Sequence, residues 1–345
     1  MITNLPDAEA LTATALRLYF SAWNRLRGIL SDWDARVPDA SLVGEVPASW
    51  QEEAEGYLDD CQSDLQATIA IVQQSNELAL KARLCAVSPY LLLFEGQLPL
   101  SNEPKDLDFF DLRTLDAQRL PQAVNTLCPT PLPHSFVTRY DALRRIRNRY
   151  THLGEAGKLL RPVAMMHDLL DQYVELWPDR GWLRDRLRAA EDDRTAGFGD
   201  KFWNPAYGVL QMWPGDMELM LTARFRRLFG VDPDAVSCLC HACRKNAETR
   251  MGLVDLNMPT AYREEHGAIR CLACHDTYQP MVEACERRGC VSTIIGTGEH
   301  DGLCYQCGHS RGGPDNDGED AVDSFARMTL LPQFDDIGPD LSSKT

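Results

Sequence analysis

The segment from Arg147 to His152 reads RNRYTH and places an arginine, an amide and a histidine within six residues. A histidine titrates near neutral pH, so it can act as a general base or a general acid. An arginine carries a permanent charge and a planar set of donors that match phosphate oxygens. These are the groups needed to cleave RNA through its own 2′-hydroxyl, and that chemistry requires no metal.

Helical geometry limits how these side chains can meet. On a straight α-helix with about 100° per residue, Arg147 and His152 lie roughly 140° apart and do not share a face. Asn148 and His152 are four residues apart and do share one, so Asn148 is the candidate to orient the imidazole. Arg147 must then reach around the helix, or the helix must end near His152, which Gly154 favours. One histidine cannot easily serve both sides of one phosphorus, so two copies facing each other across a symmetric dimer are expected.

The charge of the chain is unevenly distributed. The formal net charge of −16 argues against a general nucleic-acid coat protein, because such proteins present a net basic surface to phosphates. Residues 139–161 differ, since they hold seven arginines or lysines and two acidic residues, a local charge of +5. A basic segment in an otherwise acidic chain indicates a local anion site. Its candidate RNA-binding residues are Arg144, Arg145 and Arg149. The alternative interpretation is a solvated, arginine-rich helix face.

Nine of the twelve cysteines lie between Cys238 and Cys307, and in a cytosolic chain such clustering indicates metal more often than disulfides. Pairs separated by two or four residues let both thiolates reach one ion, and two pairs complete a tetrahedral shell. We therefore expect two structural Zn²⁺ sites with no open position for catalysis. Their predicted ligands are Cys240, Cys243, Cys271 and Cys274 in the first site, and Cys285, Cys290, Cys304 and Cys307 in the second. An interleaved pairing stays open, and Cys238 is a surplus thiol that could replace Cys240.

The elements that must position these groups are helical over roughly the first 230 residues. Apolar residues recur at helical spacing within the ranges 8–33, 50–87, 115–127, 136–152 and 160–177. Few alternating β-branched runs occur there, which predicts an all-α bundle. The fold class is therefore mainly α, with a helical bundle followed by a small zinc-binding module of short strands and turns.

The patterning divides the chain into four parts. Residues 1–178 are predicted to form the helical domain, and 179–232 a helical extension or bridge. Residues 233–311 form the zinc-binding module, and 312–345 an acidic tail that is expected to be disordered and is a candidate inhibitor of the basic cleft. Within the helical domain, residues 95–113 are expected to be an exposed, acidic connection.

Nothing in the sequence indicates a membrane protein. The densest apolar runs, such as residues 90–94, are far short of the roughly 20 residues of a membrane span. The N-terminus lacks a basic region followed by an apolar core, so no signal peptide is expected. These observations predict a cytoplasmic protein without a membrane partner.

The segment from Arg147 to His152 resembles the signature of HEPN domains, which are compact α-helical ribonucleases. That signature is an arginine, a polar residue that is often asparagine, and a histidine a few residues later. The upstream sequence NELALKARL at residues 76–84 is similar to the family's earlier helix, in which an acidic residue followed by lysine packs near the active arginine. Glu77 is the candidate for that acidic partner. The resemblance covers about residues 50–175.

The resemblance implies a metal-independent endoribonuclease that dimerises to form its cleft and leaves a 2′,3′-cyclic phosphate and a 5′-hydroxyl. The implied catalytic set is Arg147, Asn148, His152 and Glu77. Many relatives act as toxins or in defence against phage, so an antitoxin or a trigger protein is an expected partner beside the RNA substrate. In a subgroup silenced by a nucleotidyltransferase antitoxin a tyrosine stands where this chain has Gly154, which argues against that mode of silencing.

The cysteine-rich segment resembles tandem zinc ribbons over residues 238–308. Such ribbons bind nucleic acid or protein, so the module is expected to recognise the substrate or a trigger, or else only to pack on the bundle. Three alternatives to the nuclease stay open. These are a helix-capping histidine beside solvated arginines, a HEPN fold kept for binding, and a non-catalytic zinc-containing adaptor or regulator.

Overall fold

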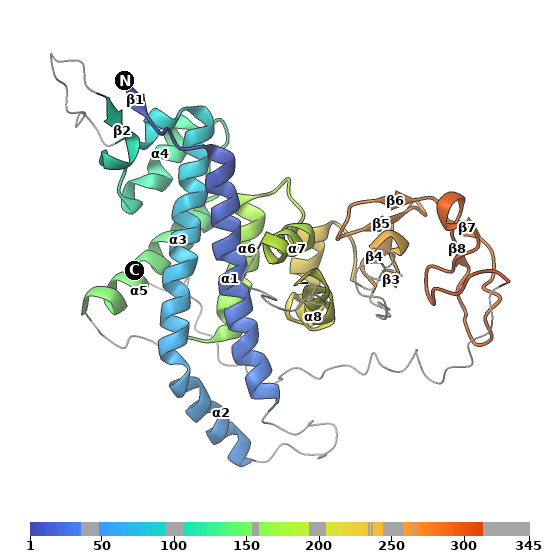
Figure 1. The fold of residues 1–345 in the computed structure, drawn as a ribbon. Coiled ribbons are helices and arrows are strands. Elements are labelled where there is room, and N and C mark those ends of the chain that lie inside the picture. Colours follow the sequence, from blue (N-terminus) through green and yellow to red (C-terminus); the bar gives the residue numbers. More distant parts are fainter. Residues whose placement is uncertain are drawn as a thin grey trace, which may run out of the picture. The chain divides into compact units, whose positions relative to one another are not determined.

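The structure is a computed structural model (Figure 1). It describes residues 1–35, 48–93, 106–153, 159–192, 205–233, 235, 237–243, 259–264 and 266–312, without the side chains of residues 48–51, 152, 153, 205–207 and 299. The predicted acidic tail beyond residue 312 and Gly154 lie outside these ranges. The described residues form two compact units that divide between Pro178 and Asp179. No helix in the described part of the chain is both long enough and apolar enough to cross a bilayer.

The first unit is a helical bundle built on two long antiparallel helices that lie side by side (Figure 1). These are α1 (Ala8–Asp34) and α3 (Gln62–Val87). Three further helices pack against α3, namely α4 (Leu120–Leu127), α5 (His134–Asn148) and α6 (Pro162–Leu176), and α6 also packs against α1. The predicted all-α bundle is therefore confirmed for this region.

Local sequence signals explain where the long helices begin and end. The Asp7 carboxylate accepts a hydrogen bond from the Ala10 backbone N–H at 2.7 Å, which caps the first turn of α1. Helix α3 ends where Ser88 takes an extended conformation before Pro89, because the residue before a proline disfavours the α region. Helices α1 and α6 meet through aromatic rings, since the buried Tyr19 of α1 packs against Tyr173 of α6 with ring centroids 5.6 Å apart.

Two details of the first unit differ from the sequence-based expectation. The continuous pattern expected over residues 50–87 is broken at Cys61 into α2 (Ala48–Asp60) and α3. Part of the connection expected to be exposed is structured, since β2 (Leu107–Asp108) pairs in parallel with β1 (Ile2–Thr3). The 3₁₀ turn η3 (Phe109–Asp111) follows and buries Phe109. An aromatic residue in an acidic loop gave the segment enough apolar surface to pack.

The second unit combines helices with two small antiparallel sheets. Its helices are α7 (Trp182–Asp192), α8 (Pro205–Leu219) and α9 (Leu221–Phe229). The first sheet has the order β3 (Ser237–Cys238), β4 (Ala261–Arg263), β5 (Ile269–Cys271) and β6 (Thr277–Tyr278). The second sheet pairs β7 (Met281–Val282) with β8 (Ile294–Ile295).

The helices α7 to α9 share one core with the first sheet. Trp213 of α8 is fully buried, and its indole N–H donates to the Pro259 carbonyl at 3.2 Å. The ring of Phe225 in α9 lies 5.5 Å from that of Tyr262 in β4, and the Tyr262 hydroxyl donates to the Met217 sulfur at 3.0 Å. The segment that the sequence assigned to an extension or bridge therefore folds as part of the cysteine-rich unit.

Candidate functional site

The first candidate site lies where α5 runs beside α3. Arg147, in the last turn of α5, donates from Nη2 to the Glu77 Oε1 atom of α3 at 3.1 Å. The Arg147 side chain is 28% exposed and that of Glu77 is 15% exposed, so the ion pair is largely withdrawn from solvent on the acidic side. The structure thus brings together the arginine and the acidic residue that the motif resemblance had paired across 70 positions of sequence.

Two buried residues that the sequence did not single out lie near this ion pair. Gln73, one turn before Glu77 on α3, donates from Nε2 to Glu77 Oε1 at 3.4 Å. Tyr140, two turns before Arg147 on α5, donates its hydroxyl to the Ala117 carbonyl at 2.8 Å. Burial and the nearby Glu77 carboxylate raise the pKa of Tyr140 above its ordinary value, while a hydrogen bond with Gln73 lowers it.

The spacing of these residues was a signal that could have revealed them. Gln73 and Glu77 stand at i and i+4, and Tyr140 and Arg147 at i and i+7, so each pair falls on one helix face. Two hydrogen bonds to Glu77 Oε1 therefore connect the buried Gln73 to the Arg147 guanidinium. They restrict the Glu77 carboxylate and, through it, the orientation of the long Arg147 side chain.

The backbone after Arg147 does not continue as an ordinary α-helix. Helix α5 ends at Asn148, and the π-helical turn η5 spans Arg149–Leu153. The Thr151 hydroxyl donates to the Arg147 carbonyl at the entrance to this turn. In π geometry the backbone hydrogen bonds span five residues instead of four, which widens the turn. Such turns are rare, and many of those known lie at functional sites.

This turn changes the sequence-based geometry of the motif. The expectation that Arg147 and His152 lie far apart around the axis, and that Asn148 shares a face with His152, assumes a straight α-helix. Closing a turn with five residues reduces the angle between Arg147 and His152 at the level of the backbone. The His152 side chain lies outside the described part of the structure, so its role and that of Asn148 stay predictions.

The basic residues around the motif are partly neutralised. Arg144 donates to Asp141 Oδ1 at 2.7 Å, and Arg145 lies 2.8 Å from Asp141 Oδ2, so two of the three candidate RNA-binding arginines share one carboxylate. Arg145 nevertheless keeps a 74% exposed side chain, and Arg149 is exposed. These two arginines stay accessible to a polyanion, whereas Arg144 is mostly covered.

Arg139 belongs to the scaffold. It contacts three carboxylates of α6, with Nη1 of Arg139 at 2.7 Å from the buried Glu175 and other nitrogens at 3.2 Å from Asp168 and 3.7 Å from Asp171. The Ser135 hydroxyl also donates to Glu175. This cluster ties α5 to α6, so Arg139 contributes to the local charge of +5 without contributing to an open anion site.

The second candidate site consists of two four-cysteine clusters in the second unit. In each cluster the four sulfur atoms lie within 4.8 Å of one another. The clusters hold the eight cysteines that the spacing singles out, namely Cys240, Cys243, Cys271 and Cys274, and Cys285, Cys290, Cys304 and Cys307. Cys238 lies in neither cluster. Burial raises the pKa of the Cys238 thiol to about 12, which suits a small apolar residue of β3 better than a metal ligand.

The sulfur positions fit a tetrahedral metal. Sulfurs about 2.3 Å from one Zn²⁺ ion stand about 3.8 Å apart at tetrahedral angles. In the first cluster the Sγ atoms of Cys240 and Cys274 are 3.6 Å apart, and those of Cys243 and Cys271 are 3.8 Å apart. In the second cluster the corresponding distances are 3.7 and 3.9 Å. Four thiolates would fill the shell, which leaves no coordination position for a substrate or a catalytic water.

The knuckle turns are built alike. The N–H of His275 donates to the Cys271 carbonyl at 3.0 Å, and the N–H of Gly308 donates to the Cys304 carbonyl at 2.9 Å. Both residues have positive φ, a conformation that glycine adopts freely and histidine tolerates. Backbone amides two residues after Cys271 and Cys304 also donate to their sulfurs, at 3.3 and 3.4 Å. Such donors stabilise thiolate charge and prepare the sulfurs to bind a cation.

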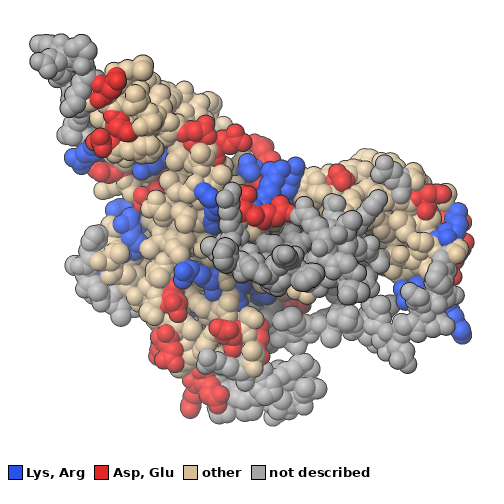
Figure 2. All heavy atoms as spheres, in the orientation of Figure 1, with Lys and Arg blue, Asp and Glu red and all other residues tan. Residues whose placement is uncertain are grey.

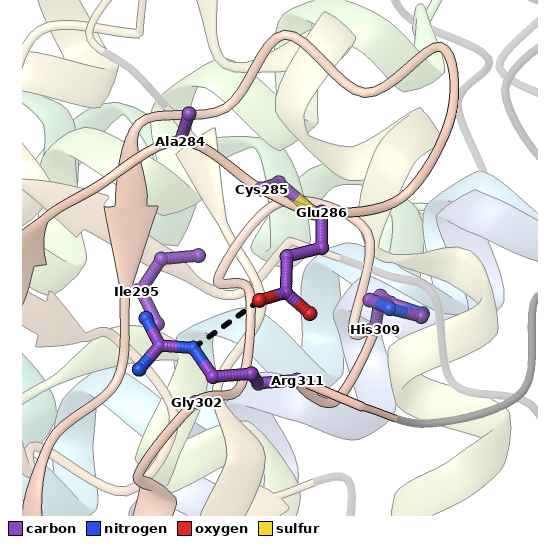
Figure 3. Close-up of a pocket in the computed structure, with 7 residues that line it drawn as sticks. All are labelled: Ala284, Cys285, Glu286, Ile295, Gly302, His309 and Arg311. Atoms are coloured by element: carbon purple, nitrogen blue, oxygen red, sulfur yellow. Dashed lines mark ion pairs between the residues drawn. The ribbon is translucent and has the colours of Figure 1, made fainter.

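A shallow pocket beside the second cluster is not an anion site (Figure 3). Figure 3 shows the Arg311 guanidinium turned toward the Glu286 carboxylate, with their Nε and Oε1 atoms 3.6 Å apart. Arg311 also pairs with Glu283. Its charge is therefore offset by two carboxylates, and Arg270 is likewise paired with Glu264.

Comparison of the chain with protein-family models, with curated proteins and with solved structures found no match. The structure shows a helical domain followed by two four-cysteine clusters that are consistent with zinc ribbons. The functional interpretation therefore depends on the chemistry of the two sites themselves.

Proposed function

We propose that this chain is a metal-independent endoribonuclease of the HEPN type, with a cysteine-rich unit that holds two structural zinc ions. The observation that carries the nuclease proposal is the Arg147–Glu77 ion pair at 3.1 Å, supported by the π-helical turn that follows it. A preorganised phosphate site requires an arginine held in one orientation, and here a half-buried carboxylate holds it beside a rare backbone turn that contains a histidine.

In the proposed reaction, His152 transfers a proton and Arg147 stabilises charge on the phosphorus. The 2′-hydroxyl of the RNA attacks the adjacent phosphorus, a histidine accepts its proton, and the departing 5′-oxygen receives a proton. The products are a 2′,3′-cyclic phosphate and a 5′-hydroxyl. Because one histidine serves one side of the phosphorus, a homodimer supplies the base from one copy and the acid from the other.

Glu77 aims Arg147 without blocking it. The ion pair occupies Nη2 of a guanidinium that has five N–H donors, so the other donors stay available to phosphate oxygens. Asn148 is proposed to orient the motif, and Arg145 and Arg149 to hold the RNA backbone through exposed charges. Arg144, already paired with Asp141 and mostly covered, is the weakest of the proposed RNA contacts.

The charge distribution of the first unit restricts where RNA can approach. Helix α2 contains five acidic residues and no lysine or arginine, and Figure 2 shows acidic side chains gathered over it. A polyanion is repelled from such a surface and attracted to the basic end of α5. A toxin or anti-phage effector, controlled by an antitoxin or a trigger protein, is the biological role that fits a self-contained RNA-cutting site.

The zinc proposal rests on the agreement between sulfur spacing and tetrahedral geometry. Zinc held by four thiolates has no free coordination position, so its contribution is folding free energy. Metal analysis of the purified chain should give two zinc ions per molecule. Fewer than about two would contradict the ligand assignment.

The nuclease proposal is tested by inducing wild type, His152→Ala and Arg147→Ala, and sequencing RNA ends after brief induction. Arg17→Ala is a matched control, because Arg17 is an exposed arginine on α1, which lies outside the motif. We expect growth arrest and new 5′-hydroxyl ends with wild type and the control, and neither with the two motif variants. Equal toxicity and intact RNA in all four strains would overturn the proposal.

A second candidate function is a non-catalytic adaptor that binds RNA or protein. The specific observation in its favour is that the cysteine clusters are complete and independent of Arg147. An adaptor predicts binding that survives Arg147→Ala and His152→Ala but is lost when Cys271 or Cys274 is replaced by serine. The nuclease predicts the opposite dependence for RNA cleavage.

A further inference from the structure

The two four-cysteine clusters of the second unit meet through four aromatic rings, which we call the ring bridge. Its members are His241, Tyr278, His300 and Tyr305. The rings of His241 and Tyr305 have centroids 4.9 Å apart, and those of Tyr278 and Tyr305 are 5.8 Å apart. His300 lies 5.4 Å from His241 and 5.2 Å from Tyr278. Tyr305 is only 1% exposed, so this is a packed interior between the clusters.

Each side of the ring bridge is attached to a metal-binding knuckle. His241 follows Cys240 in the first knuckle of one cluster, and Tyr305 follows Cys304 in a knuckle of the other. The Tyr278 hydroxyl lies 3.4 Å from the Cys240 sulfur. A ring next to a ligand in the chain can keep its position only while the knuckle keeps its turn.

The backbone joins the same two knuckles. The N–H of Leu239, immediately before Cys240, donates to the Tyr305 carbonyl at 2.6 Å. The Tyr305 N–H in turn donates to the Ile294 carbonyl of β8 at 3.1 Å. Tyr305 is therefore fixed by its ring, its carbonyl and its amide, and each contact belongs to a different part of the unit.

We propose that the two clusters are coupled metal sites. Filling either cluster raises the metal affinity of the other, and Tyr305 carries this coupling. The physical reason is that metal binding folds the knuckles that hold it. Once one knuckle is folded, the ring bridge and the Leu239–Tyr305 hydrogen bond favour the folded form of the other. Couplings of this kind change affinities by about 5- to 150-fold, and they act equally in both directions.

The clusters differ in what else supports them. The first lies on a four-stranded sheet whose Ala261 pairs with Cys271 and whose Tyr262 packs on α9. The second has a two-stranded sheet and the ring bridge. We therefore expect the second cluster to have the lower affinity when the first is empty, although the coupling factor is the same for both.

This inference rests on the zinc part of the proposed function and not on the nuclease part. The test uses the full chain and zinc titrated against a chromophoric chelator. Cys290→Ser with Cys307→Ser empties the second cluster, and the zinc affinity of the first is then compared with wild type. We expect a fall of at least 5-fold. The reverse variant, Cys243→Ser with Cys274→Ser, should lower the affinity of the second cluster by the same factor.

Tyr305 is tested in the same titration. Tyr305→Ala removes the ring and keeps the backbone hydrogen bond to Leu239, so in that background emptying the second cluster should lower the affinity of the first by a smaller factor than in the wild-type background. Tyr305→Phe keeps the ring and should keep the full coupling, and an undiminished factor in Tyr305→Ala would contradict the role of the ring. Tyr90→Ala replaces an exposed tyrosine of the first unit and is the control that should behave as wild type. Unchanged affinity of the first cluster after loss of the second overturns the coupling. A wild-type chain with fewer than two zinc ions overturns the metal sites as well.

Discussion

Replacing Glu77 with glutamine is the sharpest test of how the motif is held. The substitution keeps the shape of the side chain and an oxygen that can accept from Arg147, but it removes the negative charge. At the observed distance of 3.1 Å, two unit charges attract by about 5 kcal/mol at an effective dielectric constant of about 20. Desolvation and lost side-chain freedom reduce the net value of such a charged hydrogen bond to about 1.5–3 kcal/mol.

If this energy holds Arg147 where charge develops in the transition state, kcat should fall about 10- to 150-fold, because each 1.4 kcal/mol corresponds to a factor of ten. KM should change much less, since the phosphate contact strengthens only as the reaction proceeds. The assay is cleavage of an end-labelled single-stranded RNA by purified protein in magnesium-free buffer. Glu55→Gln, on the exposed acidic face of α2, is the matched control and should leave both constants unchanged.

Two results would refute this reasoning. A Glu77→Gln protein as active as wild type would show that the ion pair does not position Arg147. A more active protein would show that Glu77 blocks the guanidinium instead of aiming it. The double variant with Arg147→Ala should be no slower than Arg147→Ala alone, because Glu77 acts only through that arginine.

Three further outcomes are expected. Gln73→Leu should lower kcat about 3- to 10-fold, because Glu77 loses its hydrogen bond from Gln73. The control is Gln172→Leu, which replaces an equally buried side-chain amide without a hydrogen-bond partner in the described structure and should leave kcat within twofold. Similar effects of both variants would indicate a loss of packing instead. Arg139→Met should cost about 3–5 kcal/mol in chemical denaturation because it leaves the buried Glu175 without its arginine, and a loss below about 1 kcal/mol would contradict that role. Removing zinc with a strong chelator should shift tryptophan emission to the red and reduce helical circular dichroism, because Trp213 loses its hydrogen bond to Pro259. An unchanged spectrum from the metal-free chain would show that the fold of α7 to α9 does not depend on the metal clusters.

Local patterns in the sequence predicted the helices well and their interruptions poorly. Periodicity and the Ser88-Pro89 pair located α3 and its end, because these signals act within one or two turns. The break at Cys61 was missed, because the helical spacing of apolar residues continues from α2 through Cys61 into α3. The burial of Phe109 was missed because its neighbours in the sequence are mostly acidic, and the whole segment was therefore expected to be exposed.

The sequence by itself determined the chemistry available to this protein. The knuckle spacing of the cysteines and the short run from Arg147 to His152 are local features, and the spacing of residues along a chain limits which atoms can reach one ion or one phosphate. The pairing of Arg147 with Glu77 was expected from the motif resemblance, and the structure contains it. Only the tertiary structure showed that Gln73 supports this pair and that the turn η5 follows α5.

The same division holds for the second unit. Cysteine spacing predicted two metal sites, but the contact between Tyr305 and His241, and the shared core of α7 to α9 with the first sheet, join residues that are distant in sequence. Such contacts depend on how the whole apolar surface is buried, and no local pattern encodes that. The sequence therefore specified the reactive groups, while packing decided which of them touch.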